Sequence, residues 1–327
     1  MKDLVLYHAK CNDGLFAAYA HWLSKGSNAN TIYLPVDYSE TRGMSDSAIV
    51  EHIRSKVNYE DLSRVNVYVL DFSYPFAVIS ALSDMCNSVT LLDHHESAML
   101  AFMEEINYPV PSLNGFFDHT HTGCYVMFDM NRSGAILAFK HFFPDSKDVP
   151  IWFKLVEDRD LWKFKYPETK AFALGVRNYL EEKSLTGVKL FKNLHAMLTT
   201  EYDKYLSIGN VLLNTQQARV NELKALGYYS TEINGHKAAF INAEMGISSD
   251  LANSIIEDGE VKIVIVYYIL EVNGELLANL SIRSYKDVDS TFIANALGGG
   301  GHPNACGARV TKERLDTFLQ LKEIHFK

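Results

Sequence analysis

The sequence predicts an α/β protein with a parallel, doubly wound sheet in an N-terminal domain, a helical connector, and a smaller mixed-sheet α/β domain at the C-terminus. Two observations predict this organisation. Short apolar runs alternate with amphipathic stretches in the first half of the chain, as they do in strand–helix repeats around a parallel sheet. Towards the C-terminus, Asn-Gly dipeptides at 234–235 and 273–274 separate pairs of apolar runs, which is the strongest short-range signal for a β-hairpin. With 327 residues, the chain is long enough for two domains.

Near-continuous apolar runs predict the strands of the first domain, because strands that are covered on both faces carry apolar residues at nearly every position. These runs are residues 4–7, 31–36, 65–70 and 89–92, with a fifth at 125–128. Helical patterns lie between or after them, at residues 15–23, 47–56, 76–85 and 134–143.

The rest of the chain is predicted to be helical up to about residue 226 and mixed beyond it. Residues 201–226 predict one long helix, which we interpret as part of the connector. The two hairpins and three helices, at residues 249–257, 290–297 and 312–321, form the second domain. The predicted boundaries are 1–190 for the first domain, 191–226 for the connector and 227–327 for the second domain.

The composition narrows the classes of partner. The formal net charge is −9 and the sequence pI is about 5.7, whereas binding to long nucleic acid needs Lys and Arg side chains that displace counterions from phosphates. We therefore expect no long duplex as a partner. We also expect no membrane partner, because the longest apolar run, residues 263–270, is too short to span a bilayer and no secretory signal precedes the first strand. The four cysteines lack pairing-like spacing, which predicts reduced thiols and a cytoplasmic location.

Polar residues directly follow three predicted strands of the first domain. They are His8, Cys11 and Asp13 after the first strand, Asp71 after the third, and Asp93, His94 and His95 after the fourth. The carboxyl ends of parallel strands are where open α/β sheets bind ligands. Imidazole and carboxylate groups together suit Mn, Fe, Zn or Co rather than Ca. Taken singly, each group has a plain structural alternative, since Asp13 or Asp71 can cap a helix and two neighbouring histidines can lie on the surface.

Two later segments carry charged or conformationally special residues. The acidic run at residues 157–160, which includes Asp158, lies between apolar packing residues, although such runs usually mark a solvated face. Four consecutive glycines at 298–301, followed by His302, allow close backbone approach to a ligand and present amide N–H groups to an anion. A flexible linker is the alternative. Arg283 ends a predicted strand and is suited to a bidentate contact with a phosphate.

Taken together and in this order, these segments resemble the DHH-type phosphoesterases that carry a C-terminal DHH-associated domain. The name-giving Asp-His-His corresponds to residues 93–95, the opening motif ends in Asp13-Gly14, and the lone Asp of the second motif matches Asp71. The fourth, acidic motif falls at Asp158, and the C-terminal signature of glycines, His and small residues matches 299–307. The resemblance covers nearly the whole chain.

The opening motif departs from the pattern of much of the family, which has two Asp separated by one residue. Here Cys11 holds the first of those positions, and His8 stands five residues before Asp13, in a His-x-x-Cys-x-Asp-Gly variant. Three roles stay open for Cys11: a soft metal ligand, a packing thiol or a silent replacement. We expect His8 rather than Cys11 to bind the metal.

The resemblance implies a hydrolase in which two divalent cations activate water for attack on a phosphoester, with Mn²⁺ as the first choice and Mg²⁺ or Co²⁺ as alternatives. The implied metal ligands are His8, Asp13, Asp71, His94 and Asp158, with Asp71 bridging both ions. The implied catalytic residues are Asp93, which would orient an imidazole, and His95, which would face the substrate phosphate. The implied substrate-binding residues are Arg283, Gly299, Gly300, Gly301 and His302.

The resembling enzymes include single-strand exonucleases and oligoribonucleases. The acidic net charge favours a small nucleotide phosphate or a short single-stranded oligonucleotide as substrate. We expect the protein to act as a monomer or homodimer. Tyr74, Phe117 and Trp162 lie near the motifs and are candidates for stacking on a base, although such side chains more often belong to a core. Two alternatives remain. A polyphosphatase or pyrophosphatase would need more Lys and Arg around the site, and a non-catalytic relative would bind nucleotides without cleaving them.

Overall fold

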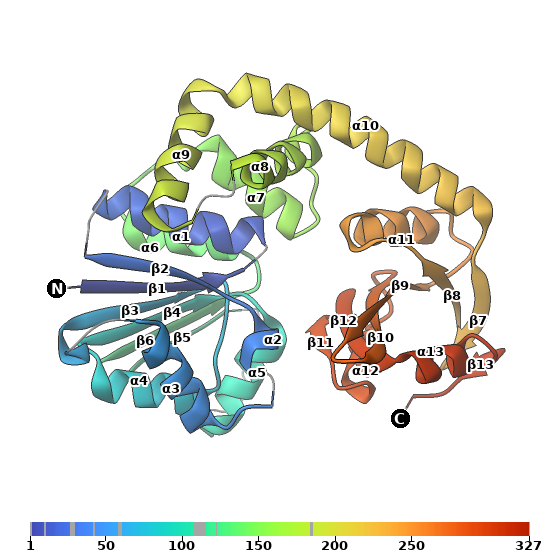
Figure 1. Ribbon diagram of the computed structural model, residues 1–327, viewed down its shortest axis with the longest axis horizontal. Helices are drawn as coiled ribbons and strands as arrows, with labels where there is room; N and C mark the ends of the chain where they lie inside the picture. Colours follow the sequence, from blue (N-terminus) through green and yellow to red (C-terminus); the bar gives the residue numbers. More distant parts are fainter. Residues whose placement is uncertain are drawn as a thin grey trace. The chain divides into compact units, whose positions relative to one another are not determined.

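The chain divides into two compact units, Met1–Leu213 and Asn214–Lys327, each of which is described by itself. The computed structural model describes residues 2–9, 11–26, 30–41, 43–57, 61–107, 116–121, 123–183 and 186–326. The division falls within the long helix α10 (Tyr202–Leu226), which is labelled in Figure 1.

Five parallel strands and one antiparallel strand form the sheet of the N-terminal unit, in the order β2-β1-β3-β4-β6-β5 (Figure 1). The strands are β1 (Lys2–His8), β2 (Thr31–Val36), β3 (Val65–Leu70), β4 (Ser88–Asp93), β5 (Phe116–His121) and β6 (Cys124–Asp129). The predicted parallel sheet is confirmed, because all strands except β5 pair in parallel. The sequence pattern does not predict β5, which pairs antiparallel with β6 at the edge.

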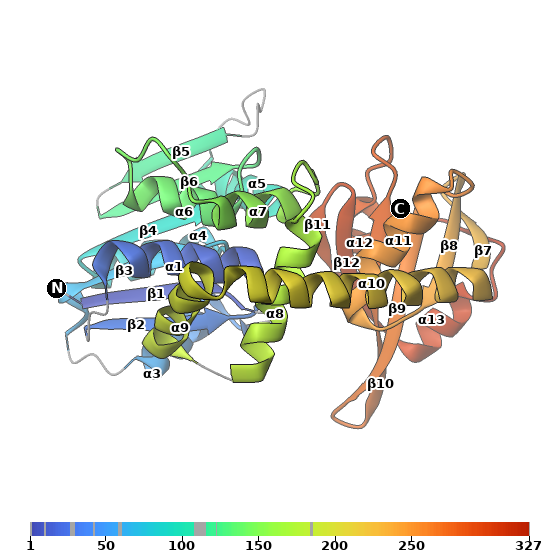
Figure 2. The ribbon, with the colours of Figure 1, turned by 90° about the horizontal axis from the view of Figure 1, so that it is seen from above.

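Helices cover both faces of this sheet, as Figures 1 and 2 show. The first face carries α1 (Asn12–Lys25), α6 (Gly134–Phe142), α7 (Ile151–Asp160), α8 (Thr169–Lys183) and α9 (Gly187–Thr200). The second carries α3 (Asp46–Lys56), α4 (Phe76–Met85) and α5 (Glu96–Glu105), with the short α2 (Tyr38–Thr41) and the 3₁₀ turn η1 (Leu62–Arg64) nearby in the chain. The sequence pattern does not predict α5.

The apolar runs of the strands have a simple cause in this layered arrangement. Alternate residues of a strand point to opposite faces. Val5 and Tyr7 of β1 therefore join the core under α1 and α6, whereas Leu4 and Leu6 join the core under α3 and α4. A strand between two such cores has no face on which a polar residue would meet water, so polar residues gather at its ends.

A mixed sheet of seven strands forms the C-terminal unit, in the order β11-β12-β10-β9-β8-β7-β13. The strands are β7 (Tyr229–Ile233), β8 (His236–Asn242), β9 (Ile263–Val272), β10 (Glu275–Ser284), β11 (Gly300–His302), β12 (Ala305–Thr311) and β13 (Glu323–Ile324). The helices of this unit are α11 (Ser248–Glu257), preceded by the 3₁₀ turn η2 (Met245–Ile247), α12 (Thr291–Ala296) and α13 (Lys312–Phe318). The predicted mixed sheet is therefore confirmed.

Both predicted hairpins are present. Asn234-Gly235 joins β7 to β8, and Asn273-Gly274 joins β9 to β10. All four residues have positive φ, between 46° and 84°, which is the backbone that a tight two-residue hairpin turn requires and that Asn and Gly adopt most readily.

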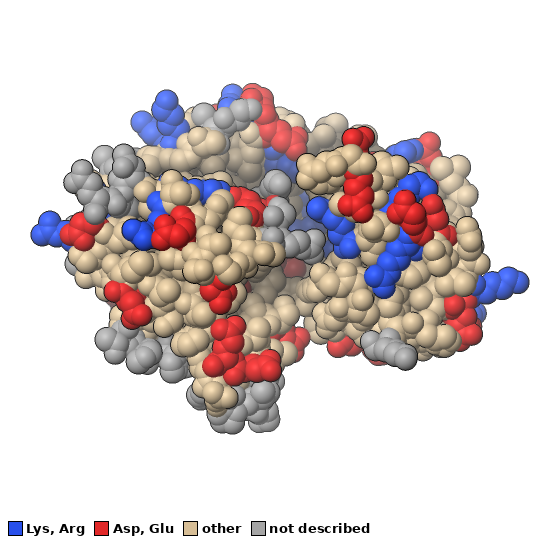
Figure 3. Space-filling view, turned by 60° about the horizontal axis from the view of Figure 1, so that its bottom comes forward, with Lys and Arg blue, Asp and Glu red and all other residues tan. Residues whose placement is uncertain are grey.

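The surface in Figure 3 carries acidic side chains at several places, while Lys and Arg side chains gather together with acidic ones on the C-terminal unit. The charge on this face is therefore mixed rather than a continuous basic stripe. Among the described helices, none combines the length and the apolar character needed to cross a bilayer.

Candidate metal centre

The register of the N-terminal sheet brings three polar residues to one edge. Tyr7 pairs with Leu70, and Leu70 pairs with Leu92. The residues that follow, His8, Asp71 and Asp93, therefore come side by side at the carboxyl ends of β1, β3 and β4. The amide of Asp71 donates to the carbonyl of Leu92 at 2.9 Å, which ties the end of β3 to β4. This edge is where the sequence predicts a ligand site.

The side chain of His94 lies at the centre of a buried acidic cluster. Its Nε2 atom is 3.2 Å from Oδ1 of Asp71, 3.4 Å from Oδ2 of Asp160 and 3.6 Å from Oδ2 of Asp13. Asp13, Asp71 and His94 are almost completely buried, while Asp160 keeps 25% of its side-chain surface exposed. On the other side of Asp71, Nδ1 of His8 lies 3.6 Å from Oδ2. Asp71 thus lies between two groups of donor atoms.

The two groups on either side of Asp71 have the composition of metal ligands. Ligand atoms of Asp13, His94 and Asp160 lie within 4.8 Å of one another, and so do those of His8, Cys11 and Asp71. Neither carboxylate oxygen of Asp71 receives a hydrogen bond, although both are buried. Leaving a buried carboxylate without a donor is costly. A cation at Asp71 would supply the missing partner, so these residues fit the predicted divalent ions.

The shifted pKa values of the cluster also favour a bound cation. Burial, and then the charges of Asp71 and Asp160, raise the pKa of Asp13 well above its usual value. Burial alone would also raise the pKa of Asp71, but the imidazoles of His8 and His94 outweigh it and hold this pKa below the usual range. For His94, burial lowers the pKa, but Asp160 and Asp71 outweigh it and raise the pKa well above 6.5. The cluster has more negative charge than its own imidazoles neutralise.

Asp93 is fully buried and is occupied by three donors. Its Oδ1 atom is 2.6 Å from Nδ1 of His95 and accepts the amide of His94 at 2.7 Å, while Oδ2 accepts the hydroxyl of Ser73 at 2.6 Å. Burial would lower the pKa of His95, but the charge of Asp93 raises it. Asp93 therefore orients the His94–His95 segment, as carboxylates behind metal-binding histidines do.

The structure brings Asp160, rather than the predicted ligand Asp158, to the cluster. The carboxylate of Asp158 accepts hydrogen bonds from the amides of Lys165 and Tyr166, at 2.8 and 3.2 Å, and from the hydroxyl of Thr169 at 2.5 Å. These bonds hold the loop between α7 and α8. Asp160 is the last residue of α7 and points at His94 instead. The predicted acidic segment therefore reaches the cluster through Asp160, because the orientation of α7 decides which of its carboxylates faces His94.

Asp13 is held by the start of α6. Its carboxylate accepts the amides of Gly134 and Ala135 at 2.6 and 3.0 Å. A Cβ atom on Gly134 would lie 2.5 Å from Cβ of Asp71, so only glycine lets α6 begin against the cluster. Sequence reasoning identifies the helix but misses Gly134 as a site residue. The available signal is Ser133-Gly134 at the helix start, since Ser133 caps α6 through the amide of Ile136.

The predicted substrate-binding residues lie in the C-terminal unit, around the edge strand β11. The glycine run is neither a linker nor an open loop, because Gly300, Gly301 and His302 pair with β12. Close packing explains two of the glycines, since a Cβ atom on Gly299 or Gly301 would lie 2.0 or 2.7 Å from a carbonyl oxygen of β12. Arg283, near the end of β10, donates to Oγ of Ser249 at 2.7 Å.

The aromatic candidates differ in their surroundings. Tyr74 is buried and belongs to a core of the N-terminal unit. The side chain of Phe117 lies outside the described residues. Trp162 is half-buried in the loop after α7, has a left-handed backbone with φ 54°, and lies under the guanidinium of Arg159 at 4.4 Å.

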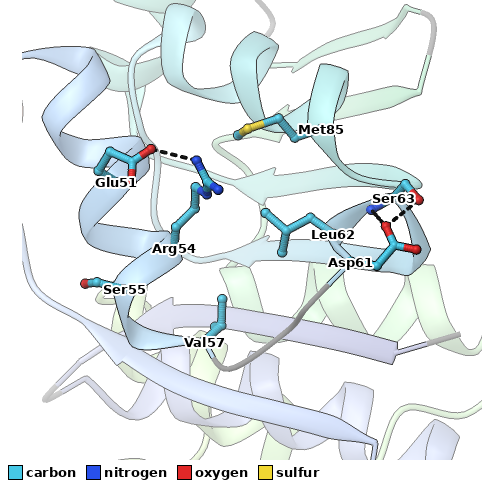
Figure 4. A pocket seen from close by; sticks show the side chains of 8 residues that line it. All are labelled: Glu51, Arg54, Ser55, Val57, Asp61, Leu62, Ser63 and Met85. Carbon is cyan, nitrogen blue, oxygen red and sulfur yellow. Dashed lines mark hydrogen bonds and ion pairs between the residues drawn. The ribbon is translucent and has the colours of Figure 1, made fainter.

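A separate hollow of about 550 Å³ lies between α3, η1 and α4 (Figure 4). Its charged groups already have partners, because Arg54 pairs with Glu51 and Asp61 accepts from Ser63. It adjoins the amino end of β3, whereas the acidic cluster lies at the carboxyl end. The hollow therefore has no part in the metal centre.

Comparisons with known proteins concern the C-terminal unit and the fold. Residues 234–324 match the DHHA1 domain. The chain is 25% identical over 318 residues to the uncharacterized protein R106 of Acanthamoeba polyphaga mimivirus, covering 93% of this chain and 66% of that protein, so it spans just under two thirds of this relative's length.

Among solved structures, the chain shares its fold with PggH of Vibrio cholerae, described as a pGpG-specific phosphodiesterase. The TM-score is 0.51 at 13% identity, and the match covers 98% of this chain and 97% of PggH. An uncharacterized protein from Helicobacter pylori G27 matches with a TM-score of 0.40 at 18% identity, over 98% of this chain and 99% of that one. The class that these findings define is a two-unit α/β fold whose C-terminal unit matches a DHHA1 domain.

Because Asp158 and Asp160 have different partners, we expect their replacement by Asn to have different effects. Asp158→Asn replaces an oxygen that accepts buried hydrogen bonds, so it should lower the free energy of unfolding by about 1–3 kcal/mol. Asp160→Asn removes like charge from the cluster, so the metal-free protein should be as stable as the wild type or more stable, while its affinity for Mn²⁺ falls roughly tenfold or more. Urea unfolding and calorimetric Mn²⁺ titration measure both effects. The reverse pattern would assign the ligand to Asp158.

The close contact of Gly134 makes a second prediction. Gly134→Ala should push α6 away from Asp71, weaken Mn²⁺ binding and lower the free energy of unfolding by about 1–3 kcal/mol, because the added Cβ has no room. Lys140→Ala, on the exposed side of the same helix, is the matched control and should bind Mn²⁺ as the wild type does. Unchanged metal affinity in Gly134→Ala would show that α6 does not position the cluster.

Proposed function

We propose that the protein is a metal-dependent phosphoesterase that hydrolyses phosphoester bonds of small nucleotide phosphates or short oligonucleotides. The observation that carries the proposal is the buried carboxylate of Asp71, whose oxygens receive no hydrogen bond and which lies between two groups of potential ligands, each of which contains an imidazole. The match of residues 234–324 to the DHHA1 domain supports the same class.

The proposed ligands follow the geometry. Asp71 would hold two divalent cations, Mn²⁺ in the first place, together with His8 on one side and with Asp13, His94 and Asp160 on the other. When bound, such cations would activate water for attack and neutralise charge that develops on the phosphoester oxygens. Asp13 is held for this role by the amides of α6, and each of its oxygens keeps a lone pair for a metal.

The catalytic residues beside the metals are assigned to the His94–His95 segment. Asp93 fixes the ring of His95 through Nδ1, which directs Nε2 away from Asp93. His95 would then contact a phosphate oxygen of the substrate. Because the net charge is −9, bound cations or a local cluster of Arg and Lys would have to supply the positive charge that attracts a phosphate.

The choice of a small nucleotide substrate rests on two arguments. PggH, whose fold is similar, is described as specific for the dinucleotide pGpG. The net charge disfavours long nucleic acids. We assign the binding of the remainder of the substrate to Arg283, the glycines of residues 299–301 and His302 in the C-terminal unit.

Two other functions are distinguished by substrate. A polyphosphatase or pyrophosphatase would release phosphate from polyphosphate or pyrophosphate and would not need a base. A non-catalytic nucleotide-binding protein would bind dinucleotides with Mn²⁺ present and release nothing. A panel of dinucleotides, longer oligomers, a nucleotide bisphosphate, cyclic dinucleotides and polyphosphate separates these functions.

Replacing Asp71 tests the metal bridge. Asp71 has φ 56°, a left-handed conformation that Asn also adopts readily, so Asp71→Asn should preserve the backbone while abolishing Mn²⁺-dependent hydrolysis of dinucleotides. Asp129→Asn is the matched control, because Asp129 also ends a strand of the same sheet but lies outside the ligand groups. Near-complete activity in a folded Asp71→Asn protein would exclude the bridging role.

Replacing His302 tests the role of the C-terminal unit. A hydrogen bond to a charged phosphate is worth about 1.5–3 kcal/mol, so His302→Ala should raise KM for a dinucleotide roughly tenfold or more while Mn²⁺ affinity stays unchanged. His325→Ala, which alters an exposed histidine of the same unit, should change neither quantity. Loss of bound metal in His302→Ala would make His302 a metal ligand rather than a substrate contact.

A further inference from the structure

Cys11 lies beside one half of the proposed metal centre, where it also caps the start of α1. Its Sγ atom and ligand atoms of His8 and Asp71 lie within 4.8 Å of one another. We propose that Cys11 is a thiolate ligand of the cation that His8 and Asp71 hold, and that this position therefore prefers a thiophilic divalent ion, Zn²⁺, Co²⁺ or Fe²⁺, over Mn²⁺ or Mg²⁺. The inference rests on the proposed metal centre and assigns the chemistry of one of its two positions.

The spacing of the three donor atoms suits one ion. Zinc binds sulfur at about 2.3 Å and nitrogen or oxygen at about 2.0–2.2 Å, so donors around one ion are roughly 3–4 Å apart. His8 Nδ1 and Asp71 Oδ2, 3.6 Å apart, already have this spacing, and the sulfur lies within 4.8 Å of a ligand atom of each residue. Thiolate, imidazole and carboxylate together form a set that zinc, cobalt and ferrous iron accept, whereas Mg²⁺ and Mn²⁺ favour oxygen donors.

The backbone around Cys11 orients its sulfur. Cys11 is the N-cap of α1, a helix of 14 residues, and its Sγ atom accepts the amide of Asp13 at 3.3 Å. Burial and the charges of Asp71, Asp160 and Asp13 raise the pKa of the free thiol well above its usual value, so the thiolate forms only together with the metal bond. The hydrogen bond from Asp13 uses one lone pair and leaves others for a metal. The cap therefore orients the sulfur without occupying it.

The environment of Asp71 is a second observation, independent of Cys11, that points to a bound cation. This residue is 1% exposed, and neither of its oxygens receives a hydrogen bond. Besides the imidazoles of His8 and His94, which lie 3.6 and 3.2 Å from these oxygens, a bound cation is the partner that would satisfy both of them. Because Cys11 and His8 offer their donor atoms to the same place, the cation that satisfies Asp71 on this side would meet the sulfur.

Gly14 explains how the sulfur comes so close to His8. A Cβ atom on Gly14 would lie 2.4 Å from the carbonyl oxygen of His8, so only glycine lets α1 begin directly against the end of β1. Cys86, Cys124 and Cys306 are not part of any ligand group among the described residues.

Metal binding exchanges a proton for a metal ion. As the sulfur–metal bond forms, the S–H bond of Cys11 breaks and its proton goes to solvent. The sulfur donates an electron pair to the metal, and one proton is released per thiolate bond. No oxidant or reductant is needed. The substitution of Cys for the more usual Asp thus keeps an anionic ligand and changes its softness.

Cobalt titration tests the proposal without relying on turnover. Metal-free wild-type protein titrated with Co²⁺ should develop a near-ultraviolet thiolate-to-cobalt charge-transfer band that saturates with the binding of one ion. Cys11→Asp should bind cobalt without that band, and its preference for Zn²⁺ over Mn²⁺, measured by calorimetry, should fall roughly tenfold or more. Cys86→Ser removes a half-buried cysteine at the end of α4 and should keep the band.

The outcomes separate this proposal from the proposed function. Loss of cobalt binding in Asp71→Asn would show that the wild type binds cobalt at Asp71. If the wild type then shows no charge-transfer band, the role of Cys11 is wrong and the metal centre remains. A band that persists in Cys11→Asp would overturn it as well. If the wild type binds no Co²⁺, Zn²⁺ or Mn²⁺ at all, the metal centre itself is wrong.

Discussion

Mutual repulsion among closely spaced carboxylates is the constraint on which the rest of this structure depends. Asp13, Asp71 and the partly exposed Asp160 converge on His94, and their negative charges interact strongly because little water reaches Asp13 and Asp71. One imidazole does not neutralise three carboxylates. The fold must therefore hold these groups against their repulsion, which costs stability in the metal-free protein. Sites that bind and transform a ligand are often strained in this way, and the cost is recovered when the ligand binds.

Separate parts of the N-terminal unit provide that restraint. The amides of α6 hold Asp13, the end of β3 and its left-handed backbone hold Asp71, and the end of α7 holds Asp160. Two glycines allow these elements to approach, since a side chain at Gly14 or Gly134 would collide with His8 or Asp71. The parallel register then places all of the strand ends at one edge. The proposed metal centre is thus a product of sheet topology and of two close backbone contacts rather than of one contiguous motif.

The sequence predicts the parts of the structure that depend on local pattern. Apolar runs reveal the five parallel strands, Asn-Gly pairs reveal both hairpins, and the order of the motifs reveals the class of site. The choice between Asp158 and Asp160 is different in kind. Two residues along a helix are turned by about 200° from each other, so only the packing of α7 decides which one faces His94. The glycine run is a second example, because nothing in the local sequence predicts that residues 300–302 form strand β11 by pairing with β12.

The most direct test of the account is anomalous diffraction from crystals grown with Mn²⁺. The account predicts two anomalous peaks within coordination distance of Asp71, one shared with His8 and the other with Asp13, His94 and Asp160. Because each carboxylate oxygen of Asp71 lacks a hydrogen-bond donor, both should be ligated in the metal-bound protein. Crystals that contain Mn²⁺ elsewhere but show no peak at Asp71 would contradict the metal centre, and with it the proposed hydrolysis.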